Sequence, residues 1–168
     1  MHDKTLIIYF SKGGASEQYT HIIAETLRTY GHVVDIVNLK REMISDLEEY
    51  DNIVVGTGVR IGKVYRRARK VLRRKDFKGK RLAIFLSSGI AVESPEKSKE
   101  KFLKSLVEKY GLDPIMYDAF PGKTPGSGGK LQDGTDPEIA KRWAQRLAER
   151  CVSFVLRETR GLSFYPTF

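Results

Sequence analysis

The feature that most constrains this chain is a run of β-branched and aromatic residues that stops at a loop of hydroxyl and glycine residues. Residues 5–10 (Thr-Leu-Ile-Ile-Tyr-Phe) show no polar alternation, which is typical of a strand buried on both faces of a parallel sheet. The loop Ser11-Lys12-Gly13-Gly14-Ala15-Ser16 follows, and a helical pattern starts at about Ala15. The amides of a first helical turn and the helix dipole favour an anion, so this stretch predicts a phosphate site.

The same alternation of strand and helix continues along the chain. Further strands are expected over residues 33–39, 51–56, 80–86 and 114–120, with helical patterns over 15–30, 66–80, 95–110 and from 136 onwards. Strands that alternate with helices imply a parallel sheet with helices on both faces, joined by right-handed crossovers. Five strands with a short second crossover favour the order 2-1-3-4-5, so the expected fold class is an α/β three-layer sandwich.

Length and composition suggest one domain. A chain of 168 residues can form a full hydrophobic core, which we expect over about 4–157, and the pattern does not place a tail at 158–168. A single cysteine, Cys151, excludes an internal disulfide framework and a multi-cysteine metal site. The longest apolar runs are of strand length, and no signal peptide is visible, so a cytoplasmic location is expected.

The positive charge of the chain is local. Of its 30 Lys and Arg residues, twelve lie between Arg60 and Arg81, against the single carboxylate of Asp76, while the whole chain carries +9. The expected basic helix over Arg66–Lys80 has several interpretations: a solvated face, or a surface for a redox protein, an anionic membrane or an acidic substrate. Nucleic acid is disfavoured, because the segment lacks interleaved aromatic residues and a nucleic-acid-binding motif.

Three loops are expected to meet at one edge of the sheet. In an open α/β sheet, ligands bind at the carboxyl ends of the strands near the switch in strand order. The first, third and fourth strands should be neighbours, and they lead into Ser11–Ser16, Thr57–Gly62 and Ser87–Ile90, which are rich in small and hydroxyl residues. Together the three loops predict a site that holds a phosphate at one end and a flat ring at the other.

The chain resembles the flavodoxin family, whose phosphate loop has the pattern Ser/Thr-x-Thr/Ser-Gly-x-Thr/Ser. Ser11, Gly14 and Ser16 match this pattern, whereas Gly13 replaces a hydroxyl residue. The resemblance spans residues 5–155 and implies FMN as the cofactor, with its phosphate on the first loop and its ring between the other two. The implied cofactor-binding residues are Ser11, Lys12, Gly13, Gly14, Ala15, Ser16, Thr57, Gly58, Val59, Arg60, Ile61, Gly62, Ser87, Ser88, Gly89 and Ile90.

Within that family, residues 55–63 (Val-Gly-Thr-Gly-Val-Arg-Ile-Gly-Lys) are similar to a segment of the flavodoxin-like, menaquinone-dependent protoporphyrinogen IX dehydrogenases. This similarity implies an FMN-dependent oxidoreductase acting on a quinone or porphyrinogen. Neither residues 57–63 nor 87–93 contain an aromatic residue that could cover the flavin, which also favours a substrate there. Arg60 would then favour negative charge on the reduced cofactor or hold a substrate carboxylate.

Two other functions stay open. The chain could be an electron-transfer flavodoxin that docks on an acidic redox partner through Arg66–Lys80, or a scaffold without a cofactor that binds a polyanion. The sequence gives neither catalytic residues nor the oligomeric state. Pro121–Asp136 is expected to be an irregular loop on the same sheet edge, either a lid or wall of the substrate site or a surface excursion. Tyr65 could reach over the flavin ring, but its place on the basic helix favours a packing residue.

Overall fold

The uninterrupted apolar runs of the sequence form the centre of one parallel sheet. The computed structural model describes residues 3–44 and 46–160, with side chains as far as Cys151. The sheet strands are β1 (Lys4–Tyr9), β2 (Val33–Asn38), β3 (Asn52–Arg60), β5 (Arg81–Ser88) and β6 (Met116–Pro121). Their order is β2-β1-β3-β5-β6, which is 2-1-3-4-5 along the chain, so the expected fold class is confirmed.

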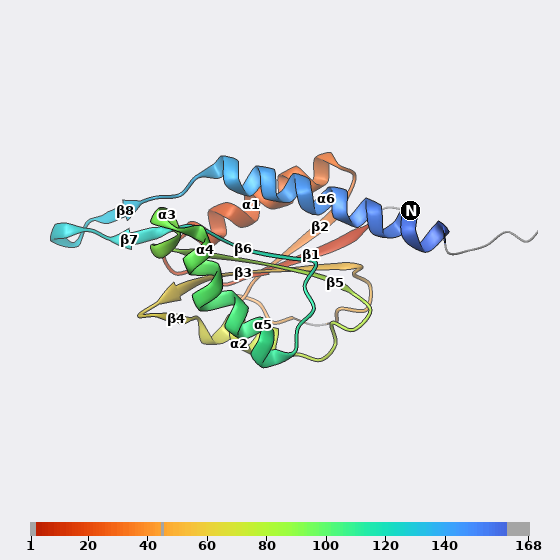
Figure 1. The fold of residues 1–168 in the computed structure, drawn as a ribbon, viewed down its shortest axis with the longest axis horizontal. Helices are drawn as coiled ribbons and strands as arrows, with labels where there is room; N and C mark the ends of the chain where they lie inside the picture. The colour runs from red at the N-terminus through yellow and green to blue at the C-terminus, as the bar shows by residue number, and fades with distance from the viewer. Residues whose placement is uncertain (1–2, 45, 161–168) are drawn as a thin grey trace, which may run out of the picture.

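Helices cover both faces of this sheet because successive strand residues point in opposite directions. On one face, α1 (Ala15–Thr29) and α6 (Pro137–Arg160) lie side by side (Figure 1). Ile7 of β1 packs into the core beneath these two helices. On the other face, Leu6 and Ile8 pack toward α2 (Arg66–Leu72) and the helical segment that follows β5. Each face therefore has its own apolar core, and the sheet separates the two.

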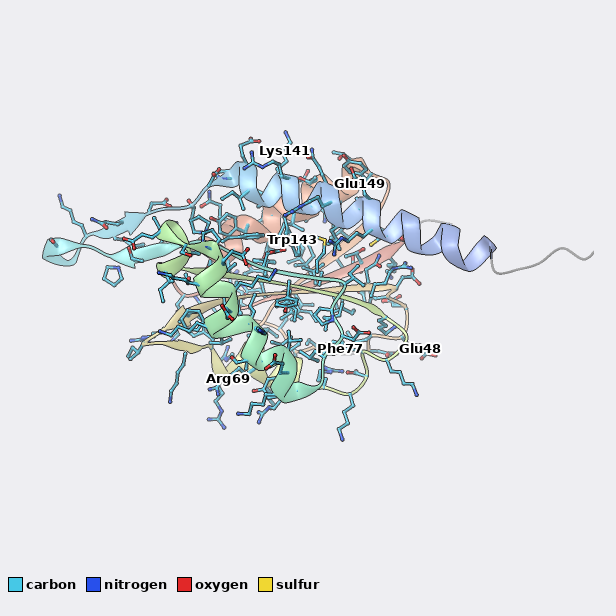
Figure 2. The ribbon with its side chains drawn as sticks, in the orientation of Figure 1. Glu48, Arg69, Phe77, Lys141, Trp143 and Glu149 are labelled. Carbon is cyan, nitrogen blue, oxygen red and sulfur yellow. The ribbon has the colours of Figure 1, made fainter. Side chains whose placement is uncertain are left out.

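Trp143 anchors α6 to the sheet. Its side chain is fully buried and lies between the helix and the strands, whereas Lys141 points away from the protein (Figure 2). The indole packs against Phe85 and Phe120, and its Nε1 donates a hydrogen bond of 2.9 Å to Asp118 of β6. Within the described part of the chain, no helix is both long enough and apolar enough to cross a membrane.

Two helices differ from the sequence-based expectation. The basic helix expected over Arg66–Lys80 ends at Leu72, because the chain turns there. Phe77 is then buried in the apolar core on the face of the sheet that α2 covers. The helix expected over 95–110 is built from α4 (Pro95–Ser98), a π-helical turn η1 (Lys99–Lys104) and α5 (Ser105–Tyr110), preceded by α3 (Ile90–Glu93). The π turn widens the helix and shifts the side chains on it relative to a regular α-helix.

The predicted loop over Thr57–Gly62 is mostly strand. β3 continues through Thr57 and Gly58 because these residues pair with Leu86 and Ser87 of β5, and it reaches Arg60 by pairing with the chain that returns after the turn. The chain then turns through Ile61 and Gly62 and returns as β4 (Lys63–Val64), antiparallel to β3. Both turn residues have positive φ, 49° and 71°, as tight two-residue hairpins require.

The segment expected to be an irregular loop, Pro121–Asp136, contains a second small sheet. β7 (Lys123–Pro125) and β8 (Leu131–Asp133) form an antiparallel hairpin around the 3₁₀ turn η2 (Ser127–Gly129). The hairpin extends beyond the sheet at the end where α3 and β4 lie (Figure 1). Each strand is only three residues long and the segment around them is rich in Gly and Pro, so the sequence pattern did not reveal them. Of the expected tail at 158–168, residues 161–168 lie outside the described part of the chain.

Candidate functional site

The three predicted segments are joined by one buried hydroxyl group. Ser16, in the first turn of α1, donates from Oγ to the carbonyl oxygen of Thr57 at 2.7 Å and lies 2.8 Å from Oγ of Ser87. Its side chain is buried, so the hydroxyl group is committed to this contact. The first loop therefore meets the ends of β3 and β5, as the strand order predicts.

These segments border a cavity of about 680 Å³ at the carboxyl edge of the sheet, which is within the size range of small-molecule sites. Every predicted site residue except Gly14 and Thr57 lines it. Thr57 is fully buried beneath the cavity, and its side chain donates to the carbonyl of Gly58. Gly14 is the N-cap of α1, with φ of 89°, a conformation that favours glycine.

Seven residues that are not among the predicted site residues also line the cavity. They are Tyr65, Lys101, Phe102, Lys123, Thr124, Pro125 and Leu131. Lys101 and Phe102 come from the π-helical turn, and the last four come from the β7–β8 hairpin. The hairpin is therefore a wall of the cavity, which is one of the roles expected for Pro121–Asp136 from its position on the same sheet edge.

Tyr65 is both a packing and a cavity residue. Its ring lies 4.9 Å from that of Phe10 in an edge-to-face arrangement, and Lys12 Nζ lies 5.8 Å from its centroid. A Cβ at Gly58 would be 3.1 Å from the Tyr65 ring, so the small residue there admits the ring to the cavity wall. Burial raises the pKa of the Tyr65 phenol, and Arg60 opposes this, so at neutral pH the group is a neutral hydrogen-bond donor.

The charge of the lining is one-sided. Lys12, Arg60, Lys101 and Lys123 line the cavity, and no carboxylate of the described residues lines it. Apolar side chains, among them Val59, Phe102 and Leu131, make up much of the remaining wall. An apolar cavity with cations at its rim suits a flat, conjugated molecule that carries negative groups.

The first loop has the features needed to hold a phosphate. The first-turn amides of α1 have no intrahelical acceptors, so they can donate to an anion in front of the helix. Ser11 Oγ accepts from the amide of Gly14 at 3.0 Å, which leaves its own proton available for donation. Gly13 has open space where a side chain would start, so a ligand can approach the backbone closely.

A doubly wound parallel sheet with this site at the switch in strand order defines a flavodoxin-like α/β protein. The flavodoxin domain family matches residues 6–125, so the chain belongs to the flavodoxin family. FMN is the cofactor of this domain, and the expected character of a redox-active flavoprotein is confirmed.

Solved structures show the same fold at low sequence identity. Flavodoxin 2 from Bacillus cereus is 21% identical, with a TM-score of 0.62, and the match covers 88% of this chain and 99% of that one. Rubredoxin oxygen:oxidoreductase from Desulfovibrio gigas is 20% identical, with a TM-score of 0.65, over 89% of this chain and 36% of that one. This chain thus corresponds to about a third of the Desulfovibrio enzyme.

One curated relative is an enzyme by name. An NAD(P)H dehydrogenase (quinone) from Paraburkholderia phymatum is 35% identical over 81 residues, covering 36% of this chain and 41% of that protein. The chain therefore matches less than half of that relative.

Proposed function

We propose that this chain is an FMN-dependent oxidoreductase that exchanges electrons with a small conjugated substrate of the quinone or porphyrinogen type. In this proposal Ser11–Ser16 hold the FMN phosphate, and the flavin ring lies between Thr57–Gly62 and Ser87–Ala91. When bound, FMN supplies the redox chemistry, because its ring accepts and returns two electrons. The protein binds the flavin, orients it and sets the charge around it.

The observation that carries the proposal is the excess of positive charge in a cavity with apolar walls. A phosphate accounts for two negative charges at most. Arg60 and Lys101 come from segments other than the phosphate loop, and both line the cavity. They suit a second molecule with carboxylate groups, such as a porphyrinogen, or negative charge on a reduced quinone. The quinone dehydrogenase that matches part of the chain supports the same class of acceptor.

The test begins with the visible spectrum of the purified protein with and without FMN. Turnover of NAD(P)H with a panel of quinones, and of protoporphyrinogen with menaquinone, then tests the substrate class. We expect Arg60→Ala to lower kcat/KM about 10- to 100-fold, the range for losing one charge-assisted contact. Lys63→Ala is the matched control, because Lys63 pairs with Arg60 across the β3–β4 hairpin but does not line the cavity.

Full turnover and full FMN affinity in Arg60→Ala would show that the assigned role of Arg60 is wrong. Failure of every quinone and porphyrinogen to react with a flavin-loaded protein would refute the enzyme proposal. A purified protein that takes up no FMN would contradict both the site placement and the redox function.

A second candidate function, electron transfer to a protein partner, is favoured by a separate basic surface. A concavity of about 520 Å³ lies between residues 39–44 and α2. Its charged lining residues are Lys40, Arg41, Glu42, Arg67, Lys70 and Arg74. Five cations against one carboxylate would attract an acidic redox protein. Electron transfer to such a partner should slow steeply as salt rises, whereas turnover of a neutral quinone should not.

A further inference from the structure

The β7–β8 hairpin is fixed at its base to the elements that form the cavity. The Tyr19 hydroxyl group of α1 donates to the carbonyl of Pro121 and accepts from the amide of Asp136 at 3.1 Å, so one side chain joins both ends of the segment. The amide of Gly122 donates to the carbonyl of Ser88 at 2.9 Å. These contacts hold the start of β7 against the end of β5.

The side chain of Lys123 extends from this fixed base to the phosphate loop. Its Nζ lies 3.5 Å from the point where a Cβ of Gly14 would stand, directly at the N-terminus of α1. The side chain is 22% exposed, and Asp133 across the hairpin is 4.0 Å away. Asp133 also accepts from the amide of Thr135 at 2.9 Å, so its charge is shared between the two partners.

The loop itself supplies little charge to a phosphate. Gly13 and Gly14 have no side-chain donors, and the Ser16 hydroxyl group is committed to Thr57 and Ser87. Lys12 lies over the Tyr65 ring, 5.8 Å from its centroid. The backbone amides and Ser11 can form hydrogen bonds, but a phosphate with a charge of −1.5 to −2 favours a cation beside them.

We propose that Lys123 pairs with the phosphate of FMN, so that the hairpin makes the site selective for the phosphorylated flavin over riboflavin. The proposal rests on the placement of the FMN phosphate at Ser11–Ser16 given above. Lys123 is delivered by a segment remote in sequence from the loop, and its ammonium group takes the place of side-chain donors that the loop lacks or commits elsewhere. The competing role for Lys123 is an ion pair with Asp133 that only stabilises the hairpin.

The experiment measures the dissociation constants of FMN and riboflavin, by flavin fluorescence, for the wild-type protein and three variants. We expect Lys123→Gln to weaken FMN binding about 10- to 100-fold and to leave riboflavin binding unchanged, because riboflavin has no phosphate. Lys123→Arg keeps the charge and should stay within a few-fold of wild type for both flavins. Lys130→Gln is the control, since Lys130 belongs to the same hairpin but does not line the cavity.

The salt dependence gives a second measurement. FMN binding by wild type should weaken with rising salt more steeply than FMN binding by Lys123→Gln. Unchanged FMN affinity in Lys123→Gln would overturn the proposal, and so would an equal loss of both flavins, which indicates a purely structural role. If the wild-type protein binds no FMN, the site placement fails together with this assignment, whereas the first two outcomes leave that placement intact.

Discussion

At the scale of single residues, Ile61 is the most unusual position in the site. It is a β-branched residue with φ of 49°, and its side chain is 90% exposed at the rim of the cavity. A left-handed conformation costs a residue with a Cβ about 1–2 kcal/mol, and β-branching adds to this. A strained and exposed apolar side chain gains nothing in stability, which is consistent with a role in contacting a ligand.

Ile61→Asn should therefore stabilise the protein in the absence of flavin. Asn tolerates positive φ, so we expect the free energy of unfolding to rise by about 1 kcal/mol and the Tm by about 2–4 °C. Thermal and urea unfolding of the apo form measure this. Lys63→Asn, in the same hairpin but without a positive φ, should not stabilise the protein, and equal stabilisation by both variants would show that backbone strain is not the cause.

At the scale of elements, the hairpin lies against the end of β5 because Gly89 has no side chain. A Cβ at Gly89 would be 2.2 Å from Cγ2 of Thr124, closer than atoms can approach. The φ of Gly89 is −66°, an ordinary value, so the need for glycine at this position is steric. The close approach keeps Thr124 and the neighbouring Lys123 beside the cavity.

Gly89→Ala should destabilise the apo protein by about 1–3 kcal/mol, the usual cost of overpacking. Thr124→Ser removes the methyl group that would collide, so the double variant should recover most of that loss, as a double-mutant cycle in urea would show. Gly13→Ala serves as the control, because a Cβ there meets nothing within 4 Å. If the loss of stability in the double variant equals the sum of the two single effects, Gly89 and Thr124 do not contact each other.

At the scale of the whole molecule, the two edges of the sheet have different roles. The carboxyl edge forms the cavity, whereas the amino edge has a buried polar network that joins β1, β3 and β5 to His32, which precedes β2. Thr5 Oγ1 lies 3.1 Å from Nδ1 of His32 and accepts from Nδ2 of Asn52 at 3.0 Å, and Arg81 donates to Oδ1 of Asn52 at 2.6 Å. Burial lowers the pKa of His32 below its ordinary value.

Stability should therefore fall in mild acid. Because the pKa of His32 is lower in the folded than in the unfolded protein, the unfolded chain binds more protons once the pH falls below about 6.5. The free energy of unfolding should be constant above that pH and decrease below it, by up to about 1.4 kcal/mol per pH unit. Urea unfolding between pH 8 and 5 tests this. His32→Gln should reduce the slope, whereas His21→Gln, exposed on α1, should retain it.

Patterns along the chain are enough to predict the fold class, the strand order and most of the residues that line the cavity. Uninterrupted apolar runs such as residues 5–10 favour strands buried on both faces of a sheet, and the apolar spacing along α1 and α6 favours helices. Parallel strands place their carboxyl ends at one edge, so the three loops had to meet there.

The residues that complete the cavity from distant segments depend instead on the three-dimensional packing of the chain. Lys101 and Phe102 reach it through a π-helical turn, and Lys123 reaches it through a hairpin whose strands are three residues long. The direction of the Ser16 hydroxyl group, inward to Thr57 and Ser87, likewise depends on which strand ends lie beside it. Local patterns record the neighbours of a residue along the chain, whereas contacts between distant segments depend on how the packed elements place their side chains.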